Sequence, residues 1–159
     1  MTKIINIKNF YLSVFVLSII ILLSAIYIEY IIGAKPCKLC LYQRLPYIVA
    51  IFICFFGFNY STKNLWVYFL LFTFFISLIL SLYHVGIEQG IFPEFSGCTS
   101  SNLGIINKDE LLNRLNETPP NCKDVNFRVL GLSLATLNVL ISLVIIIISG
   151  IFLKYEKNR

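Results

Sequence analysis

The chain has 159 residues, of which 58% are hydrophobic and only 13% are charged, and its formal net charge is +5. Soluble domains carry about 25% charged residues, so this composition excludes an ordinary soluble protein and indicates one that presents apolar surface to lipid. The cations stand at the ends of apolar runs and form no basic stripe, which argues against a nucleic-acid-binding protein.

Four long runs without Asp, Glu, Lys or Arg predict four membrane-spanning helices. The expected spans cover residues 10–28, 45–62, 64–87 and 129–153. Each run is close to the length that crosses a bilayer core of about 30 Å. The first run follows two lysines, as a signal peptide does, but its length and the later spans predict a retained helix. We therefore expect an all-α membrane protein, a four-helix bundle that forms one domain over residues 1–159.

Two loops, residues 29–44 and 88–128, carry four of the five cysteines. Two spans separate these loops, so they lie on the same side of the membrane, and both termini lie on the other. The longer loop contains Lys108–Asn116, whose leucines and preceding capping-box pattern predict a short amphipathic helix on the membrane surface. Lysine and arginine are almost evenly divided between the two sides and do not decide the orientation. Paired cysteines outside the bilayer indicate an oxidising compartment, which places both termini in the cytoplasm.

Cys37 and Cys40 form a Cys-x-x-Cys motif at the start of the second span. Thiol–disulfide exchange needs a thiolate and a second thiol within reach, and a helix N-terminus lowers the pKa of the attacking thiol. The motif could instead be a static disulfide or half of a zinc site. Zinc would require a second such motif or a histidine pair, and the chain has one histidine. We therefore expect a redox-active pair and no metal site.

Two further residues are candidates for contact with a ligand. On a continuous helix Arg44 would share a face with both thiols, where it could stabilise a thiolate or bind a carbonyl oxygen. It could equally be an anchor that extends to the membrane interface. His84 and Glu88 stand four residues apart, so His84 could pair with Glu88 or contact a ligand.

The other three cysteines differ in setting. Cys98 and Cys122 match no metal-binding spacing and are suited to a disulfide that closes the long loop, either as a structural link or as an electron carrier. Cys54 stands inside an uncharged run and is most simply a small buried hydrophobic residue.

These features together resemble the DsbB family of bacterial disulfide bond formation proteins. The resemblance rests on Cys37-Lys-Leu-Cys40 followed by Tyr42-Gln-Arg44, on Tyr83-His-Val-Gly-Ile-Glu-Gln-Gly90, on the cysteine pair of the long loop and on the four spans. It extends over essentially the whole chain, and the combination is far more specific than the Cys-x-x-Cys motif alone.

The resemblance implies a protein of the bacterial inner membrane that reoxidises a periplasmic, thioredoxin-fold dithiol oxidase of the DsbA type. Electrons would pass from the Cys98–Cys122 pair to the Cys37–Cys40 pair. By family position, Cys98 would form the bridge to the membrane-proximal pair, and the partner would attach at Cys122.

The resemblance also implies a membrane quinone, either ubiquinone or menaquinone, as the electron acceptor. Cys40 would be the thiolate that forms a charge-transfer adduct with the quinone, and Arg44 and His84 would belong to the quinone-binding site. Two other hypotheses remain open from the sequence. One is a dithiol relay to a different membrane thiol protein, and the other is a non-enzymatic protein with structural disulfides.

Overall fold

The computed structural model describes residues 7–60, 64–93, 122, 128–129 and 131–157. Four helical segments within these residues are long and apolar enough to cross a membrane. The long helices are α1 (Ile7–Tyr30), α3 (Leu45–Asn59), α4 (Leu65–Glu88) and α6 (Leu134–Lys157). The short helix α2 (Lys38–Tyr42) precedes α3, and the two together form the second span. The expectation of an all-α protein with four spans is confirmed.

Two boundaries differ from the expected spans by five residues or more, for local reasons. The second span begins with α2 at Lys38 rather than at residue 45. The last span begins at Leu134 rather than at residue 129, because the two-residue strands β1 (Arg128–Val129) and β2 (Leu132–Ser133) pair around a turn. Val129, Leu132 and Ser133 carry no charge and so extend the uncharged run in the sequence, but they lie in the strands and not in the helix. The amphipathic helix expected at residues 108–116 lies outside the described residues.

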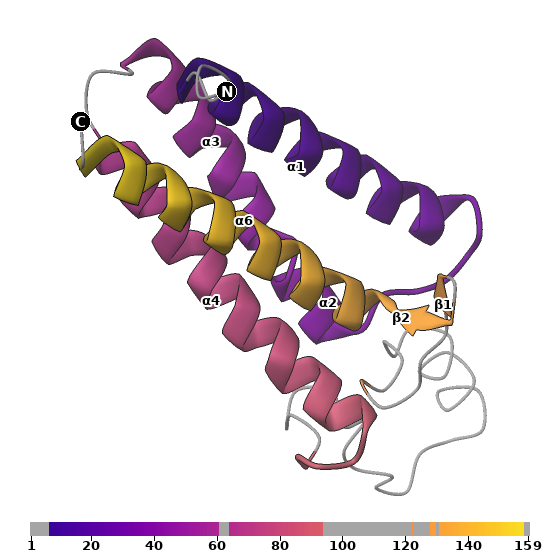
Figure 1. The fold of residues 1–159 in the computed structure, drawn as a ribbon. Helices are drawn as coiled ribbons and strands as arrows, with labels where there is room; N and C mark the ends of the chain where they lie inside the picture. The colour runs from indigo at the N-terminus through magenta and orange to yellow at the C-terminus, as the bar shows by residue number, and fades with distance from the viewer. Residues whose placement is uncertain (1–6, 61–63, 94–121, 123–127, 130, 158–159) are drawn as a thin grey trace, which may run out of the picture.

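The helices pack as an antiparallel bundle in which α3 contacts α1 and α4, and α4 contacts α6. In Figure 1, α1 begins and α6 ends at one end of the bundle, whereas α2 and the β1–β2 pair lie at the other. At most 39% of the residues in any span are buried inside the protein. The outward surfaces are rich in exposed apolar side chains such as Leu23, Phe52 and Phe72, which are suited to contact lipid tails.

Buried polar side chains link the spans to one another. The Ser142 hydroxyl of α6 donates to Ser77 Oγ of α4 at 3.0 Å. The Tyr47 hydroxyl of α3 donates to Asn138 Oδ1 of α6. A hydrogen bond between membrane helices contributes about 0.6 kcal/mol on average, so these links orient the helices more than they stabilise them.

The end of α4 is shaped by two glycines. The Gly90 N–H donates to the Ile87 carbonyl, and the Ile91 N–H donates to the Gly86 carbonyl, which is the Schellman pattern of a helix C-terminus. Gly90 has a φ of +74°, a conformation that glycine adopts without steric cost. A Cβ at Gly86 would clash with the Phe92 ring, so any larger residue would force the segment that folds back over this helix end to shift. This turn fixes the end of the helix that carries His84.

Candidate redox site

A cavity of about 240 Å³ opens at the end of the bundle where α2 lies. Apolar side chains from α1 and α6 form part of its wall. Its polar and sulfur-containing lining comes from Ser24, Lys35, Cys37, Cys40, Gln43, Arg44, Tyr47, His84, Glu88, Cys122 and Asn138. The cavity therefore brings together every sequence-predicted site residue that the structure describes.

Cys37 and Cys40 lie on either side of the first turn of α2. Cys37 has an extended backbone and is the N-cap of the helix, and its Sγ accepts a hydrogen bond from the Cys40 N–H at 3.3 Å. Both residues are free thiols, and their Sγ atoms are 2.8 Å apart. The pair is therefore close enough to interconvert between dithiol and disulfide with a small change of side-chain position.

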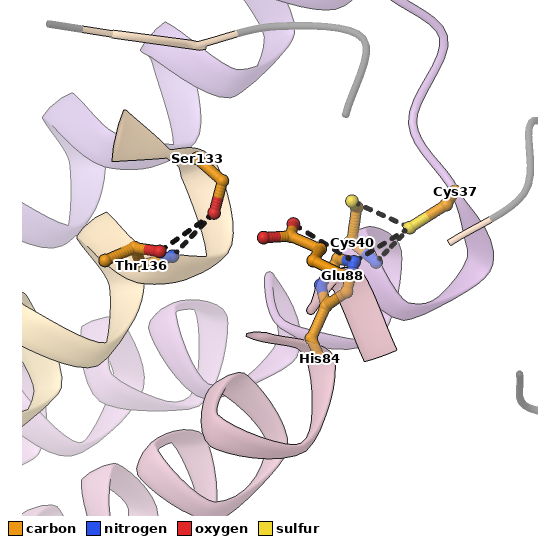
Figure 2. Close-up of polar contacts among 6 residues, drawn as sticks. All are labelled: Cys37, Cys40, His84, Glu88, Ser133 and Thr136. Carbon is orange, nitrogen blue, oxygen red and sulfur yellow. Dashed lines mark hydrogen bonds and ion pairs between the residues drawn. The ribbon is translucent and has the colours of Figure 1, made fainter. Parts of the chain in front are cut away.

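His84 connects this thiol pair to a carboxylate, as Figure 2 shows. Its Nε2 lies 3.6 Å from Cys37 Sγ and 3.7 Å from Glu88 Oε1, and its side chain is only 3% exposed. The expected pairing of His84 with Glu88 is present. The contact with Cys37 was not predicted, because the two residues are 47 positions apart and no local pattern relates them.

These contacts favour the thiolate form of Cys37, which lies just before the second span. The hydrogen bond from the Cys40 thiol lowers the pKa of Cys37 most, and the contact with His84 lowers it further, whereas burial opposes both. The net result is a Cys37 pKa well below the ordinary value for a thiol. Since the thiolate is the reactive species in disulfide exchange, Cys37 is set up as a nucleophile.

Cys122 lies beside this thiolate although it is remote in the sequence. It is disulfide-bonded and only 2% exposed. Its Sγ, Cys37 Sγ and a ring nitrogen of His84 all lie within 4.8 Å of one another. A thiolate and a disulfide sulfur at this separation can exchange after a small displacement. The family position assigned the bridge to Cys98, but this proximity favours Cys122, and Cys98 lies outside the described residues.

The same three residues have the side-chain types of a zinc site. A structural zinc site, however, requires four ligands, and cysteine binds as the thiolate. In this form the sulfur of Cys122 is held in a disulfide, so Cys37 and His84 are the two members of the group that could act as ligands. The arrangement is better suited to disulfide exchange than to metal binding.

Arg44 lies in a different local setting from the one expected. Because α2 ends at Tyr42 and α3 begins at Leu45, Arg44 stands in the link between two helices and not on a continuous helix with the cysteines. Its Nη1 donates to Glu29 Oε2 of α1 at 2.7 Å, and both side chains are about a quarter exposed. Arg44 nevertheless lines the same cavity as the thiols.

Sequence reasoning missed Gln43, which precedes Arg44 in the same link. The residue is 7% exposed and lines the cavity. Among the described residues, its side-chain Nε2 has no hydrogen-bond partner. An amide beside the Cys-x-x-Cys motif of an apolar span was the available signal, but spacing alone does not reveal burial.

Comparison with known proteins identifies the family. A family model described as "Disulfide bond formation protein DsbB" matches residues 7–152. The chain belongs to the DsbB family. It is also similar to the uncharacterized protein RP370 of Rickettsia prowazekii (strain Madrid E), with 31% identity over 149 residues that cover 90% of this chain and 86% of that protein. The DsbB match includes every residue of the cavity, and membership indicates a membrane thiol oxidoreductase that forms disulfide bonds.

Proposed function

We propose that this DsbB-family protein reoxidises a DsbA-type thioredoxin-fold dithiol oxidase and passes the electrons to a membrane quinone. The observation that carries the proposal is the juxtaposition of Cys37, Cys40 and Cys122 at one cavity at the end of the spans. Such a position is accessible both to thiols in water and to an acceptor dissolved in lipid. The cysteine end would face the oxidising compartment, with both termini in the cytoplasm and the chain acting as a single domain.

The thiol steps follow from the positions of the sulfur atoms. A partner thiolate attacks Cys98 in the loop disulfide and releases the Cys122 thiolate. The Cys122 thiolate attacks Cys37 in a Cys37–Cys40 disulfide, which forms the Cys122–Cys37 bond and releases the Cys40 thiolate. After the partner leaves as a disulfide, Cys98 attacks Cys122, which restores the loop disulfide and leaves Cys37 and Cys40 as a dithiol. The form with Cys122 bonded and Cys37 and Cys40 free corresponds to the end of this sequence.

The cavity fits a quinone by its chemistry. Ligand sites of this kind are mostly apolar with a few well-placed polar groups, and this wall combines apolar side chains with Arg44, His84 and a buried amide that lacks a partner. Arg44 and His84 would hold the quinone beside Cys40. A bound quinone accepts two electrons and two protons, which is what the Cys37–Cys40 dithiol loses when it forms a disulfide.

Anaerobic turnover tests the proposal. Purified protein in detergent receives a reduced DsbA-type partner and a soluble short-tail quinone, and quinone absorbance is followed over time. We expect catalytic quinone loss that disappears in Cys37→Ser and Cys122→Ser and persists in the matched variant Cys54→Ser. Partner oxidation in stoichiometric amount only would indicate a relay to another acceptor. Absence of any exchange would return the cysteines to a structural role.

Trapping distinguishes the two possible bridges. A Cys40→Ser variant cannot re-form the membrane-proximal disulfide, so an interloop bond to Cys37 should accumulate. If Cys122 forms the bridge, the Cys37 thiolate of Cys40→Ser attacks Cys122 in the loop disulfide, so a Cys37–Cys122 bond accumulates while Cys98 is released as a free thiol that can be alkylated. Peptide mapping by mass spectrometry without reductant gives the answer, and the reverse pattern would restore the bridge to Cys98.

A further inference from the structure

We propose that Gln43 donates a hydrogen bond from its side-chain amide to a carbonyl oxygen of the bound quinone. The inference rests on the proposed quinone function and adds a binding residue to it. It does not depend on which cysteine forms the bridge to the long loop.

The position of Gln43 is fixed by its backbone. Its N–H donates to the Leu39 carbonyl at 3.0 Å, and the Arg44 N–H that follows donates to the Leu41 carbonyl at 3.1 Å. The side chain is therefore attached to a rigid link between α2 and α3. It is more than nine-tenths buried and lines the cavity three residues after Cys40.

The amide nitrogen of Gln43 is a donor that the described part of the protein leaves without an acceptor. Burial of an unpaired amide is costly, and native proteins seldom retain such a group without a partner. A ligand with a carbonyl acceptor in the cavity would complete the hydrogen bond. The two carbonyl oxygens of a quinone ring accept hydrogen bonds and do not donate them, which matches an amide N–H.

Two of the neighbouring polar groups, Arg44 and His84, already have partners within the protein. Arg44 directs a donor to Glu29 at 2.7 Å. His84 Nε2 lies 3.6 Å from Cys37 Sγ and 3.7 Å from Glu88 Oε1, so this nitrogen already has two partners in the protein. The other ring nitrogen, Nδ1, is buried without a partner among the described residues, which leaves this atom of His84 for a second contact with the ligand. Gln43 is thus a buried donor with capacity to spare.

The substitution Gln43→Met separates a binding role from a structural one. Methionine has a similar length and fills the same space but has no donor. If Gln43 serves the ligand, the quinone-free variant should unfold at the same temperature as the wild type or higher, because an unpaired buried amide has been removed. The same variant should bind quinone more weakly by roughly tenfold, the value of one well-formed hydrogen bond.

The experiment measures the affinity for a short-tail quinone by equilibrium dialysis of protein stripped of quinone. The melting temperature and the rate of disulfide exchange with a reduced dithiol partner are measured on the same protein. In Gln43→Met we expect weaker binding and a higher KM for quinone, with unchanged exchange. Gln43→Glu keeps the shape but replaces the donors with acceptors, so it should weaken binding at least as much. Gln89→Met is the matched control, because Gln89 is exposed at the end of α4 and outside the cavity.

The outcomes separate the two proposals. If the wild type binds quinone and Gln43→Met binds it with an affinity within about twofold of the wild type, the role of Gln43 is overturned. The proposed quinone function would then remain intact. A quinone-free variant with a lower melting temperature and impaired exchange, or failure of both variants to fold, would assign Gln43 a structural role instead. A wild-type protein that exchanges disulfides but binds no quinone would overturn both proposals.

Discussion

Cys37 and Cys54 have the same side chain, are both free and are both buried, at 5% and 1% exposure, yet they lie in opposite environments. Cys54 is in the apolar core that joins α1, α3, α4 and α6 and packs with aromatic and aliphatic side chains. Cys37 belongs to a small cluster at the cavity, where sulfur atoms and an imidazole surround it.

The difference shows that neighbours, and not burial, decide what a buried cysteine can do. Apolar contacts stabilise the neutral thiol, which then behaves as a small hydrophobic group. A second thiol and a histidine stabilise the thiolate, which can attack a disulfide. In this protein the two environments occupy different parts of one bundle, so the apolar core can hold the spans together while the cavity end carries the chemistry.

Among the variants that test the contrast between the redox cavity and the apolar core, Cys40→Ser is expected to have the largest effect on turnover. Serine keeps a hydrogen-bonding group beside Cys37 but cannot form the disulfide, so quinone reduction driven by a reduced partner should fall to the uncatalysed background. Anaerobic turnover measures the loss, and Cys54→Ser provides the control at the apolar site. Substantial turnover by Cys40→Ser would mean that electrons leave through a different thiol.

A smaller effect is expected from Arg44→Ala. The guanidinium lines the cavity, and loss of a charged donor to a carbonyl oxygen corresponds to roughly a tenfold to hundredfold rise in the quinone KM with little change in the rate of disulfide exchange. Glu29→Gln is the matched control, because it frees Arg44 from its ion pair without removing the charge. If the quinone kinetics of Arg44→Ala match those of the wild type, the arginine is only an interfacial anchor.

A titration of the Cys37 thiol tests whether its neighbours stabilise the thiolate, as the comparison with Cys54 requires. Because the pKa of Cys37 is lowered, its thiolate should persist at neutral pH and be lost only when the pH falls through that lowered pKa. His84→Gln removes one of the interactions that lower it, so the pKa should rise and the thiolate fraction at neutral pH should fall. The remaining hydrogen bond from Cys40, which is the larger cause, makes the rise partial.

Ultraviolet absorbance of the thiolate follows this titration. The measurement uses protein that lacks Cys54 and both loop cysteines, so that only the Cys-x-x-Cys pair contributes. Glu88→Gln serves as a second variant that keeps the imidazole in place. If the thiolate titration curve of His84→Gln superimposes on that of the same protein with His84 in place, the histidine contact does not set the charge of Cys37.

The spans could be predicted from the sequence because length without charge is sufficient to identify a membrane helix. The break between α2 and α3 at Gln43 and Arg44 could not be predicted from the sequence. Neither residue is a strong helix breaker, and Pro46 is compatible with the first turn of a helix. The late start of α6 depends on Ser133, whose Oγ caps the helix by accepting from the Thr136 N–H at 3.1 Å. A hydropathy pattern does not distinguish such a capped start from an earlier one.

The candidate site was predictable in its residue types but not in its contacts. A Cys-x-x-Cys motif identifies a redox pair by local chemistry alone. The approach of His84 and Cys122 to Cys37 depends on how the end of α4 and Cys122 pack against α2 in one cluster, and no spacing in the sequence encodes that packing. For the same reason the sequence did not indicate that Cys122 lies beside Cys37, and the family position of Cys98 stays a prediction because Cys98 lies outside the described residues.

The smallest effect is expected at the apolar site itself, in Cys54→Ala. Loss of one buried sulfur leaves a small cavity among apolar side chains, so the free energy of unfolding should fall by about 1 kcal/mol, as for removal of a single methylene. Turnover should equal that of the wild type, because Cys54 lies in the apolar core cluster and does not line the redox cavity. Denaturation in detergent and anaerobic turnover measure the two quantities on the same sample. A large loss of turnover in a variant that remains folded would show that the apolar core takes part in electron transfer. The core around Cys54 and the cavity around Cys37 could then no longer be assigned separately to stability and to chemistry.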